Sequence, residues 1–302
     1  MNRQLTQAVL AAGLICSAWA TQAQTITLKV HHFLNSQSIQ HTVMLKTWCD
    51  NIAKDSSNRL NCQIYPSMQL GGTAPQLYDQ ARDGVVDIAW TLPGNTPGRF
   101  PRIEAFELPF VSHQKAAVNV QAVQTLFERR MRDEYADTQI LCAWGHDGGL
   151  IHSRREVRRQ EDLAGLKLRF PTRQAGEALR ALGAAPIGMP VPQIPEALSQ
   201  GVIDGAVVPW EVVPSIRLHE ALRFHTEIPG TPTLYIATFV LAMNKAKYNS
   251  LAPDLKKVID NNSGMATSAF LGKTQQGNDG IGRKSASDRG NTIYTVSVAE
   301  AQ

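Results

Sequence analysis

The sequence lacks the signatures of several large classes of protein. It contains no glycine-rich phosphate loop, no Gly-x-Ser-x-Gly nucleophile elbow and no His-Glu-x-x-His zinc motif, so the usual constellations of kinases, serine hydrolases and zinc peptidases are missing. No run of lysine and arginine is interleaved with aromatic residues, and the formal net charge of +4 is small for 302 residues. We therefore expect no nucleic-acid partner, and the missing reactive motifs favour a binding protein over an enzyme.

Long apolar runs are also scarce, and the one near the N-terminus has the layout of a secretory signal peptide. One arginine precedes an apolar run from Ala8 to Ala20, and small residues follow up to Ala23. This run is too short to cross a membrane, and no later stretch reaches the required length of about 20 residues. We expect residues 1–23 to be removed, with cleavage near Ala23, and the mature protein to be periplasmic and not membrane-spanning.

Cysteine is rare, with four residues in the chain. Cys16 lies in the predicted signal peptide, and Cys142 lies in an apolar stretch that is typical of a core strand. Cys49 and Cys62 are close in sequence, and two interpretations are open for them. They form either a disulfide, which would contribute about 3 kcal/mol to stability, or two buried thiols.

Short apolar runs alternate with helical patterns, which predicts an α/β fold with largely parallel sheets. One local pattern occurs twice, at 81–90 and at 198–208: a helix end, a glycine, a β-branched pair and an aspartate. Gly84 and Gly201 can adopt the left-handed conformation that ends a helix. We expect each β-branched pair to begin a buried strand and each aspartate to bond back to its loop. A joint that is used twice predicts two similar lobes.

The other predicted elements follow from hydrophobic periodicity and from breaker residues. The tail from 272 to 302 mixes glycine, glutamine, asparagine and aspartate, and it predicts no particular element. Strands are predicted at 26–30, 61–65, 165–171, 187–191 and 234–244, and helices at 38–56, 174–182, 193–200 and 253–259.

Candidate ligand-binding residues lie near predicted strand ends, where α/β folds place their crevices. Arg169 ends an apolar strand, and its guanidinium fork matches a carboxylate, although an internal ion pair fits the pattern equally well. His32 and His146 are candidate hydrogen-bond donors to a ligand. Because no two histidines have the i, i+4 spacing on a helix, we predict no metal site and no cofactor. The aromatic candidates, which are either core residues or a stacking wall for a flat ligand, are Phe33, Trp90, Trp144, Phe170 and Trp210.

Five segments, in the same order, resemble the DctP-type solute-binding family of TRAP transporters. They are Tyr65–Gly72 (YPSMQLGG), the first joint, Phe106–Phe110 (FELPF), Leu163–Arg169 (LAGLKLR) and Gly201–Gly205 (GVIDG). The resemblance extends from about residue 25 to the end of the chain. It implies a two-lobed Venus flytrap fold with the ligand cleft between the lobes. Lobe I would comprise 24–148 plus about 235–270, and lobe II would comprise 149–234 plus about 271–302, which includes a cross-lobe segment.

The resemblance also implies a small organic acid as ligand and a membrane permease, driven by an ion gradient rather than by ATP, as partner. Arg169 matches the family's carboxylate-binding arginine. We expect the lobes to close on the ligand, with Phe33, Trp90 and His146 completing the contacts. A receptor for an ATP-driven importer or a sensor would have a similar fold. A periplasmic enzyme would need a nucleophile or a metal that the sequence does not indicate.

Two positions depart from the family's pattern. Val208 stands where many members have asparagine, and Gly148 falls near the position of a second arginine in members that bind sialic acid. Both differences remove polar partners, which argues against a sugar acid. Together with Trp210 and Glu211, which follow the first of them, they favour a smaller or aromatic carboxylate. The sequence also stops at Gln302, whereas family members usually continue into further C-terminal helices.

Overall fold

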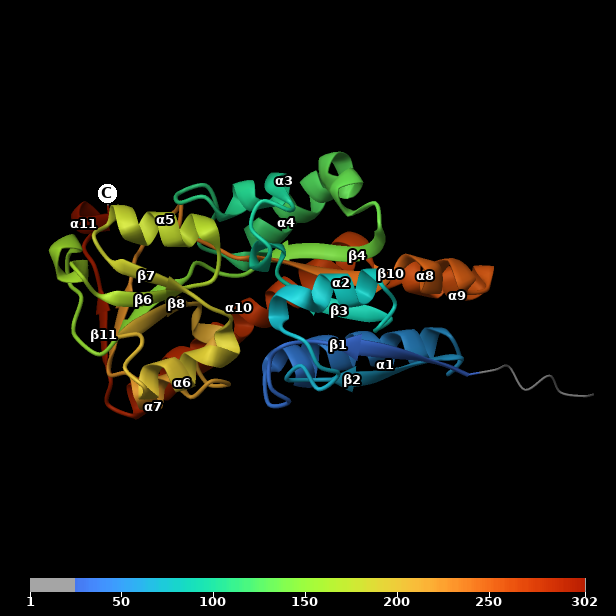
Figure 1. Ribbon diagram of the computed structural model, residues 1–302, viewed down its shortest axis with the longest axis horizontal. Helices are drawn as coiled ribbons and strands as arrows, with labels where there is room; N and C mark the ends of the chain where they lie inside the picture. The colour runs from blue at the N-terminus through green and yellow to red at the C-terminus, as the bar shows by residue number, and fades with distance from the viewer. Residues whose placement is uncertain (1–24, 302) are drawn as a thin grey trace, which may run out of the picture.

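The computed structural model describes residues 25–301, so the predicted signal peptide lies outside the described residues. The chain forms two lobes, each built on one mixed β-sheet with helices around it, as the α/β prediction required (Figure 1). Within the described residues, no helix has the length and hydropathy that spanning a bilayer demands.

Lobe I is built on a five-stranded sheet. Two of its inner strands, β3 (Ile88–Thr91) and β10 (Thr238–Asn244), are buried at every residue, because helices cover both faces of the inner strands of an α/β sheet. The strand order is β2 (Leu60–Tyr65), β1 (Ile26–His31), β3 (Ile88–Thr91), β10 (Thr238–Asn244) and β4 (Thr138–Gly145). The helices of this lobe are α1 (Lys46–Asp55), α2 (Leu77–Arg82), α3 (Pro101–Glu104), α4 (Ala116–Leu126), α8 (Lys245–Ser250) and α9 (Pro253–Asn261).

Lobe II is built on a six-stranded sheet, which lies on the left in Figure 1. The strand order is β11 (Thr292–Thr295), β9 (Phe224–Glu227), β5 (Leu150–Ser153), β8 (Gly205–Val208), β6 (Lys167–Phe170) and β7 (Ala185–Gly188). The helices are α5 (Arg173–Ala181), α6 (Ile194–Ser199), α7 (Leu218–Ala221) and α11 (Val298–Ala301). In each sheet one strand runs antiparallel to both of its neighbours, β10 in lobe I and β5 in lobe II.

The chain passes between the lobes three times. The first two passages, 146–149 and 228–237, each lead directly into the antiparallel strand of the next sheet. The third is α10 (Gly264–Asp288), which packs against α4 and β4 of lobe I and against the 3-10 turn Trp210–Val212, α7 and β11 of lobe II. In Figure 1 this helix runs behind the region between the lobes.

The repeated joint occupies equivalent places in the two lobes. Gly84 and Gly201 both have positive φ angles, +76° and +68°, as predicted for residues that end a helix. The strands, however, begin later than predicted, at Ile88 and at Gly205. The first valine of each β-branched pair, Val85 and Val202, is 52% and 43% exposed instead of buried in a strand.

The two aspartates of the joints explain the late start of the strands. Asp87 Oδ2 accepts a hydrogen bond from the backbone N–H of Lys29 (2.8 Å), and Asp204 Oδ2 accepts one from Lys167 (3.0 Å). Each carboxylate therefore takes the place of a backbone acceptor for the neighbouring strand. The prediction that these aspartates bond back to their own loops was wrong in this respect.

Other predicted boundaries shift for identifiable reasons. The strand predicted at 234–244 begins at Thr238, because the residues before it cross between the lobes. The tail, for which no element was predicted, forms most of the 25-residue helix α10 and the edge strand β11. Cys49 and Cys62 are joined in a disulfide that links α1 to β2, and the buried Cys142 is a free thiol.

Candidate functional site

A small cavity lies between the two lobes. Residues of both lobes and of the crossing segments line it, and most of them are apolar. The lining consists of Phe33, Leu34, Gln40, Trp90, Leu92, His146, Arg169, Pro171, Val191, Val208, Pro209, Glu211, Val212, Tyr235, Ala237 and Phe239. Such a composition, apolar walls with a few polar groups, is typical of small-molecule sites.

Arg169 is the cation of this cavity. It lies near the end of β6, and its guanidinium is held by two backbone carbonyls: Nε donates to Met189 O (2.8 Å) and Nη1 donates to Val207 O (3.2 Å). Both acceptors belong to the segments on either side of β6, so the strand order itself orients the fork. The side chain is 2% exposed, and burial lowers its pKa to about 10, which leaves it charged at neutral pH.

No acidic residue neutralises Arg169. Among residues 25–301, no carboxylate lies within ion-pair distance of its guanidinium. A buried charge without a counter-ion is unfavourable, because desolvation removes the stabilisation by water that an exposed guanidinium has. The arrangement is therefore suited to an anion that enters from outside the chain.

Glu211 and Gln40 form the second polar feature of the cavity. Gln40 Nε2 donates to Glu211 Oε2 (2.7 Å), and Gln275 Nε2 donates to Glu211 Oε1 (3.1 Å). Gln275 is itself oriented by Trp144, whose Nε1 donates to Gln275 Oε1 (2.8 Å). Burial raises the pKa of Glu211 to about 7, although the two amide donors counteract this shift. The carboxyl of Glu211 thus lies at the end of a chain of hydrogen bonds that runs from lobe I through α10.

Aromatic rings form one wall of the cavity. Phe33 stacks on Trp90 with ring centroids 4.8 Å apart and planes inclined by 22°. Phe239, on β10, lies 5.4 Å from the ring of Trp90. The wall therefore joins residues that follow β1, lie in β3 and lie in β10, and neighbouring strands of one sheet bring them together.

His146 lines the cavity, but both of its ring nitrogens have protein partners. Nδ1 donates to the carbonyl of Asp147, and Nε2 accepts the N–H of Ala237 (2.9 Å). Burial lowers the pKa of His146 to about 4, so the ring is neutral at physiological pH. Its position at the end of the first crossing makes it a fixed part of the wall.

Four of the predicted candidates lie outside the lining, and one of them is Trp144, whose Nε1 donates to Gln275. His32 bonds to His41 (Nε2 to Nδ1, 2.9 Å) behind Trp90, and burial lowers its pKa to about 3. Phe170 packs against α5 and the end of β7 on the other side of β6. Trp210 packs against two histidines, and its Nε1 donates to Glu227 Oε1 (3.0 Å). The cavity thus brings together Phe33, Trp90, His146, Arg169 and Glu211.

Several lining residues were not predicted from the sequence. Gln40 begins a π-helical turn, Gln40–Leu45, ahead of α1, and nothing in the local pattern distinguishes it from a surface glutamine. Tyr235 and Phe239 fell within one predicted apolar strand. A tyrosine just before a buried strand was the only available signal. Val208, the departure from the family's asparagine, does line the cavity as an apolar contact.

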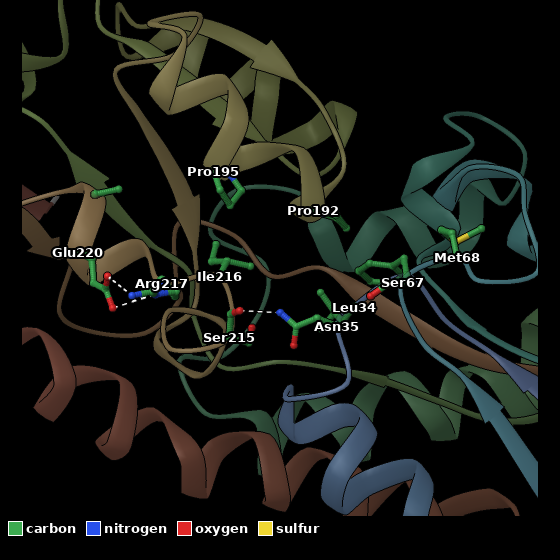
Figure 2. A pocket seen from close by; sticks show the side chains of 12 residues that line it. Leu34, Asn35, Ser67, Met68, Pro192, Pro195, Ser215, Ile216, Arg217 and Glu220 are labelled. Atoms are coloured by element: carbon green, nitrogen blue, oxygen red, sulfur yellow. Dashed lines mark hydrogen bonds and ion pairs between the residues drawn. The ribbon is translucent and has the colours of Figure 1, made fainter.

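An open groove between the lobes adjoins the cavity, with which it shares Phe33 and Leu34 (Figure 2). Across this groove Asn35 Nδ2 donates to Ser215 O (2.6 Å), as the dashed line in Figure 2 shows. A second bridge between the lobes lies farther away, where Glu104 Oε2 accepts hydrogen bonds from Arg173 and Gln174 of α5. These bonds hold the lobes together around the cavity.

Metal ligation is not indicated at this site. Within the part of the chain that the structure describes, no group of three or more histidine, cysteine, aspartate or glutamate side chains is arranged to hold a metal ion. The polar groups of the cavity are a guanidinium, a carboxyl, an amide, an imidazole, a phenol and an indole N–H. This set suits an organic anion.

Comparison with known proteins gives consistent matches. The family model for bacterial extracellular solute-binding protein, family 7 (DctP) matches residues 30–302. A TRAP solute-binding protein from Rhodoferax ferrireducens, solved in complex with copurified benzoate, is 52% identical. Its TM-score is 0.90, and the match covers 92% of this chain and 87% of that one.

Two further matches are to proteins whose ligands are not benzoate. A TRAP solute-binding protein from a marine metagenome, specific for aromatic acid ligands and solved with 3-hydroxybenzoate, is 44% identical. Its TM-score is 0.90, with 92% of this chain and 87% of that chain covered. The 2,3-diketo-L-gulonate-binding periplasmic protein of Escherichia coli is 25% identical over 85% of this chain and 77% of its own length. From the family model and these structural neighbours together, the chain belongs to the DctP family of bacterial extracellular solute-binding proteins.

Proposed function

We propose that this protein is the periplasmic receptor of a TRAP transporter and that it binds an aromatic carboxylate. The ligand carboxylate pairs with Arg169, its ring lies against the wall of Phe33 and Trp90, and the loaded protein delivers it to the membrane permease. The protein itself performs no chemistry on the ligand.

The observation that carries this proposal is the buried guanidinium without a counter-ion. Arg169 is oriented by two backbone carbonyls and has no carboxylate partner among residues 25–301. A planar carboxylate can accept two parallel hydrogen bonds from such a guanidinium fork. A lysine ammonium, which is a point charge, could not donate such a pair. Burial strengthens this pairing, because the effective dielectric constant is lower than in water.

The aromatic class follows from the rest of the lining. Outside the polar groups, the walls are aromatic rings, prolines and branched aliphatic side chains, including Val208. A sugar acid would leave most of its hydroxyl groups without partners there, and each unpaired group is unfavourable. The 52% and 44% identical structures contain benzoate and 3-hydroxybenzoate, which supports the same class over the diketogulonate of the more distant relative.

A periplasmic location fits the chemistry of the chain. The disulfide between Cys49 and Cys62 persists in an oxidising compartment and is rare in the cytosol. The N-terminal segment has the sequence of an export signal. The permease partner is inferred from the family to which the chain belongs.

Isothermal calorimetry on the purified protein tests the proposal. We expect benzoate and its ring-substituted relatives to bind, benzamide to bind at least about 100-fold more weakly, and the ligand to be recovered unchanged. Arg169→Lys should weaken benzoate binding by about 100-fold or more, because an ammonium cannot reproduce the bidentate fork.

Arg180→Lys is the matched control, because Arg180 lies on the exposed side of α5 and pairs with Glu177 at the surface. It should bind benzoate as the unmodified protein does. Unchanged affinity in Arg169→Lys would remove the arginine clamp. Conversion of the ligand would make the protein an enzyme. Ligand uptake by intact cells that survives collapse of the ion gradient but not depletion of ATP would replace the TRAP permease with an ATP-driven importer.

A further inference from the structure

Two polar atoms of the cavity lining are buried without a protein partner. In residues 25–301, eleven buried side-chain nitrogen and oxygen atoms lack any hydrogen-bond partner. Only Gln40 Oε1 and Trp90 Nε1 belong to residues that line the cavity between the lobes. Both side chains are 2% exposed. Buried polar groups are almost always satisfied in native proteins, so an unpartnered pair at a ligand cavity points to the ligand.

The hydrogen-bonding character of these two atoms is fixed. An indole N–H can only donate. The amide of Gln40 is oriented by Glu211, because its Nε2 donates to Glu211 Oε2 at 2.7 Å, and its Oε1 therefore remains as an acceptor. Glu211 is in turn held by Gln275, whose own orientation is set by the N–H of Trp144. The buried unpartnered atoms of the lining thus offer one donor and one acceptor in addition to the guanidinium.

We infer that Trp90 and Gln40 form a subsite for a hydroxyl group on the aromatic ring of the ligand. A hydroxyl accepts the N–H of Trp90 and donates its proton to Gln40 Oε1, so that one atom satisfies both orphaned groups. A carboxylate could accept from Trp90 but could not donate to Gln40, and a methyl or halogen substituent could satisfy neither requirement. This inference rests on the proposed function, in which the carboxylate of the ligand is bound by Arg169.

Two other polar groups of the cavity, His146 and Glu211, do not compete for this role. Both ring nitrogens of His146 have protein partners, and both carboxyl oxygens of Glu211 already accept an amide N–H. Trp90 also belongs to the stacking wall with Phe33. A ring that lies along this wall brings its substituents to the edge of the indole, where the N–H is located.

The first experiment varies the ligand and leaves the protein intact. Dissociation constants are measured for benzoate, the three hydroxybenzoate isomers and their methyl ethers. We expect at least one hydroxybenzoate to bind about tenfold or more tightly than benzoate, because benzoate leaves two buried groups unpaired. We expect the methyl ether of that isomer to lose the advantage, because it cannot donate to Gln40.

The second experiment uses Trp90→Phe, which removes the N–H and keeps an aromatic ring in the wall. The ratio of hydroxybenzoate to benzoate affinity should fall by about tenfold in this variant. Trp48→Phe is the matched control, because the N–H of Trp48 bonds to Asn262 O in the core of lobe I, away from the cavity. It should keep the ratio of the unmodified protein.

The outcomes separate this inference from the proposed function. If the unmodified protein binds benzoate at least as tightly as every hydroxybenzoate, the hydroxyl subsite is wrong while the aromatic-carboxylate receptor stands. An unchanged ratio in Trp90→Phe also overturns the subsite. If no aromatic carboxylate binds at all, the proposed function fails first and the subsite fails with it.

Discussion

Replacement of Gly282 by alanine should destabilise the protein, although alanine is the better helix former. Gly282 lies in α10 where this helix passes the 3-10 turn Trp210–Val212. A Cβ atom at this position would lie far inside van der Waals contact with the carbonyl oxygen of Trp210, and 2.7 Å from its carbonyl carbon. Because the obstacle is backbone and not a flexible side chain, either the helix or the turn must move.

The expected magnitude comes from two opposing terms. A glycine-to-alanine change within a helix stabilises it by about 1 kcal/mol. Overpacking that displaces backbone is unfavourable by about 1–3 kcal/mol, occasionally more. Gly277 and Gly280 lie in the same helix, and a Cβ atom added at either position would meet nothing within 4 Å, so only the favourable term applies to them. Because the gain in helix propensity is common to both variants, Gly282→Ala should be less stable than Gly280→Ala by the overpacking term, about 1–3 kcal/mol.

Urea unfolding, with linear extrapolation of the free energy, measures this difference. Gly277→Ala and Gly280→Ala are matched controls and should be as stable as the unmodified protein or more stable. Gly282→Ala should also weaken benzoate binding, because the displaced turn carries Glu211, which lines the cavity. Equal stabilisation by all three substitutions would show that α10 does not pack against the turn as closely as the structure has it, and would refute the reasoning.

Three further predictions concern the disulfide, the pH dependence and the closure of the lobes. Replacement of Cys49 and Cys62 by alanine should lower the free energy of unfolding by about 3 kcal/mol, and reduction of the unmodified protein should match that loss in urea titrations. Burial and the neighbouring carboxyl of Asp147 raise the pKa of Asp279 to about 9. The folded state therefore keeps a proton that the unfolded chain loses above about pH 4, so this contribution to stability should fall from about pH 4, through neutral pH, to about pH 9. Asp279 contributes at most about 1.4 kcal/mol per pH unit to this slope. Asp279→Asn should flatten the slope above pH 7, beyond the range in which Glu211 titrates, and an unchanged slope there would assign it to another group. Asn35→Ala removes the bond across the groove and should raise the ligand dissociation rate about two- to tenfold, which stopped-flow fluorescence measures; an unchanged rate would mean that this bond does not hold the closed form.

The two-lobed fold could be predicted because its signals are local. A glycine that ends a helix and an alternation of apolar runs need no knowledge of distant residues. The same locality explains where the prediction failed. Asp87 and Asp204 bond to residues of neighbouring strands that lie 58 and 37 positions earlier in the chain, and a single sequence segment does not reveal such a partner.

The candidate site could be predicted in part, and strand geometry explains the remainder. Arg169 was identified because the end of a strand in an α/β fold meets a crevice. Within a β-strand, neighbouring side chains point to opposite faces of the sheet, so adjacent strand residues differ in their access to a cavity. In β6 the cavity therefore receives Arg169 but not Phe170. Outside the strands, where this alternation does not apply, it receives Phe33 but not His32 and Glu211 but not Trp210, which the sequence pattern could not distinguish.

The composition of α10 shows why the sequence did not predict this element. Its glycines and polar residues weaken a helical pattern, and the sequence alone therefore predicted no element there. The structure requires these residues, because one helix must lie against both lobes. Gly282 permits close approach to the backbone of lobe II. Gln275 accepts a hydrogen bond from Trp144 of lobe I and donates one to Glu211 of lobe II. The residues that obscure the helix in the sequence are thus the ones that attach it to the lobes and to the lining of the cavity.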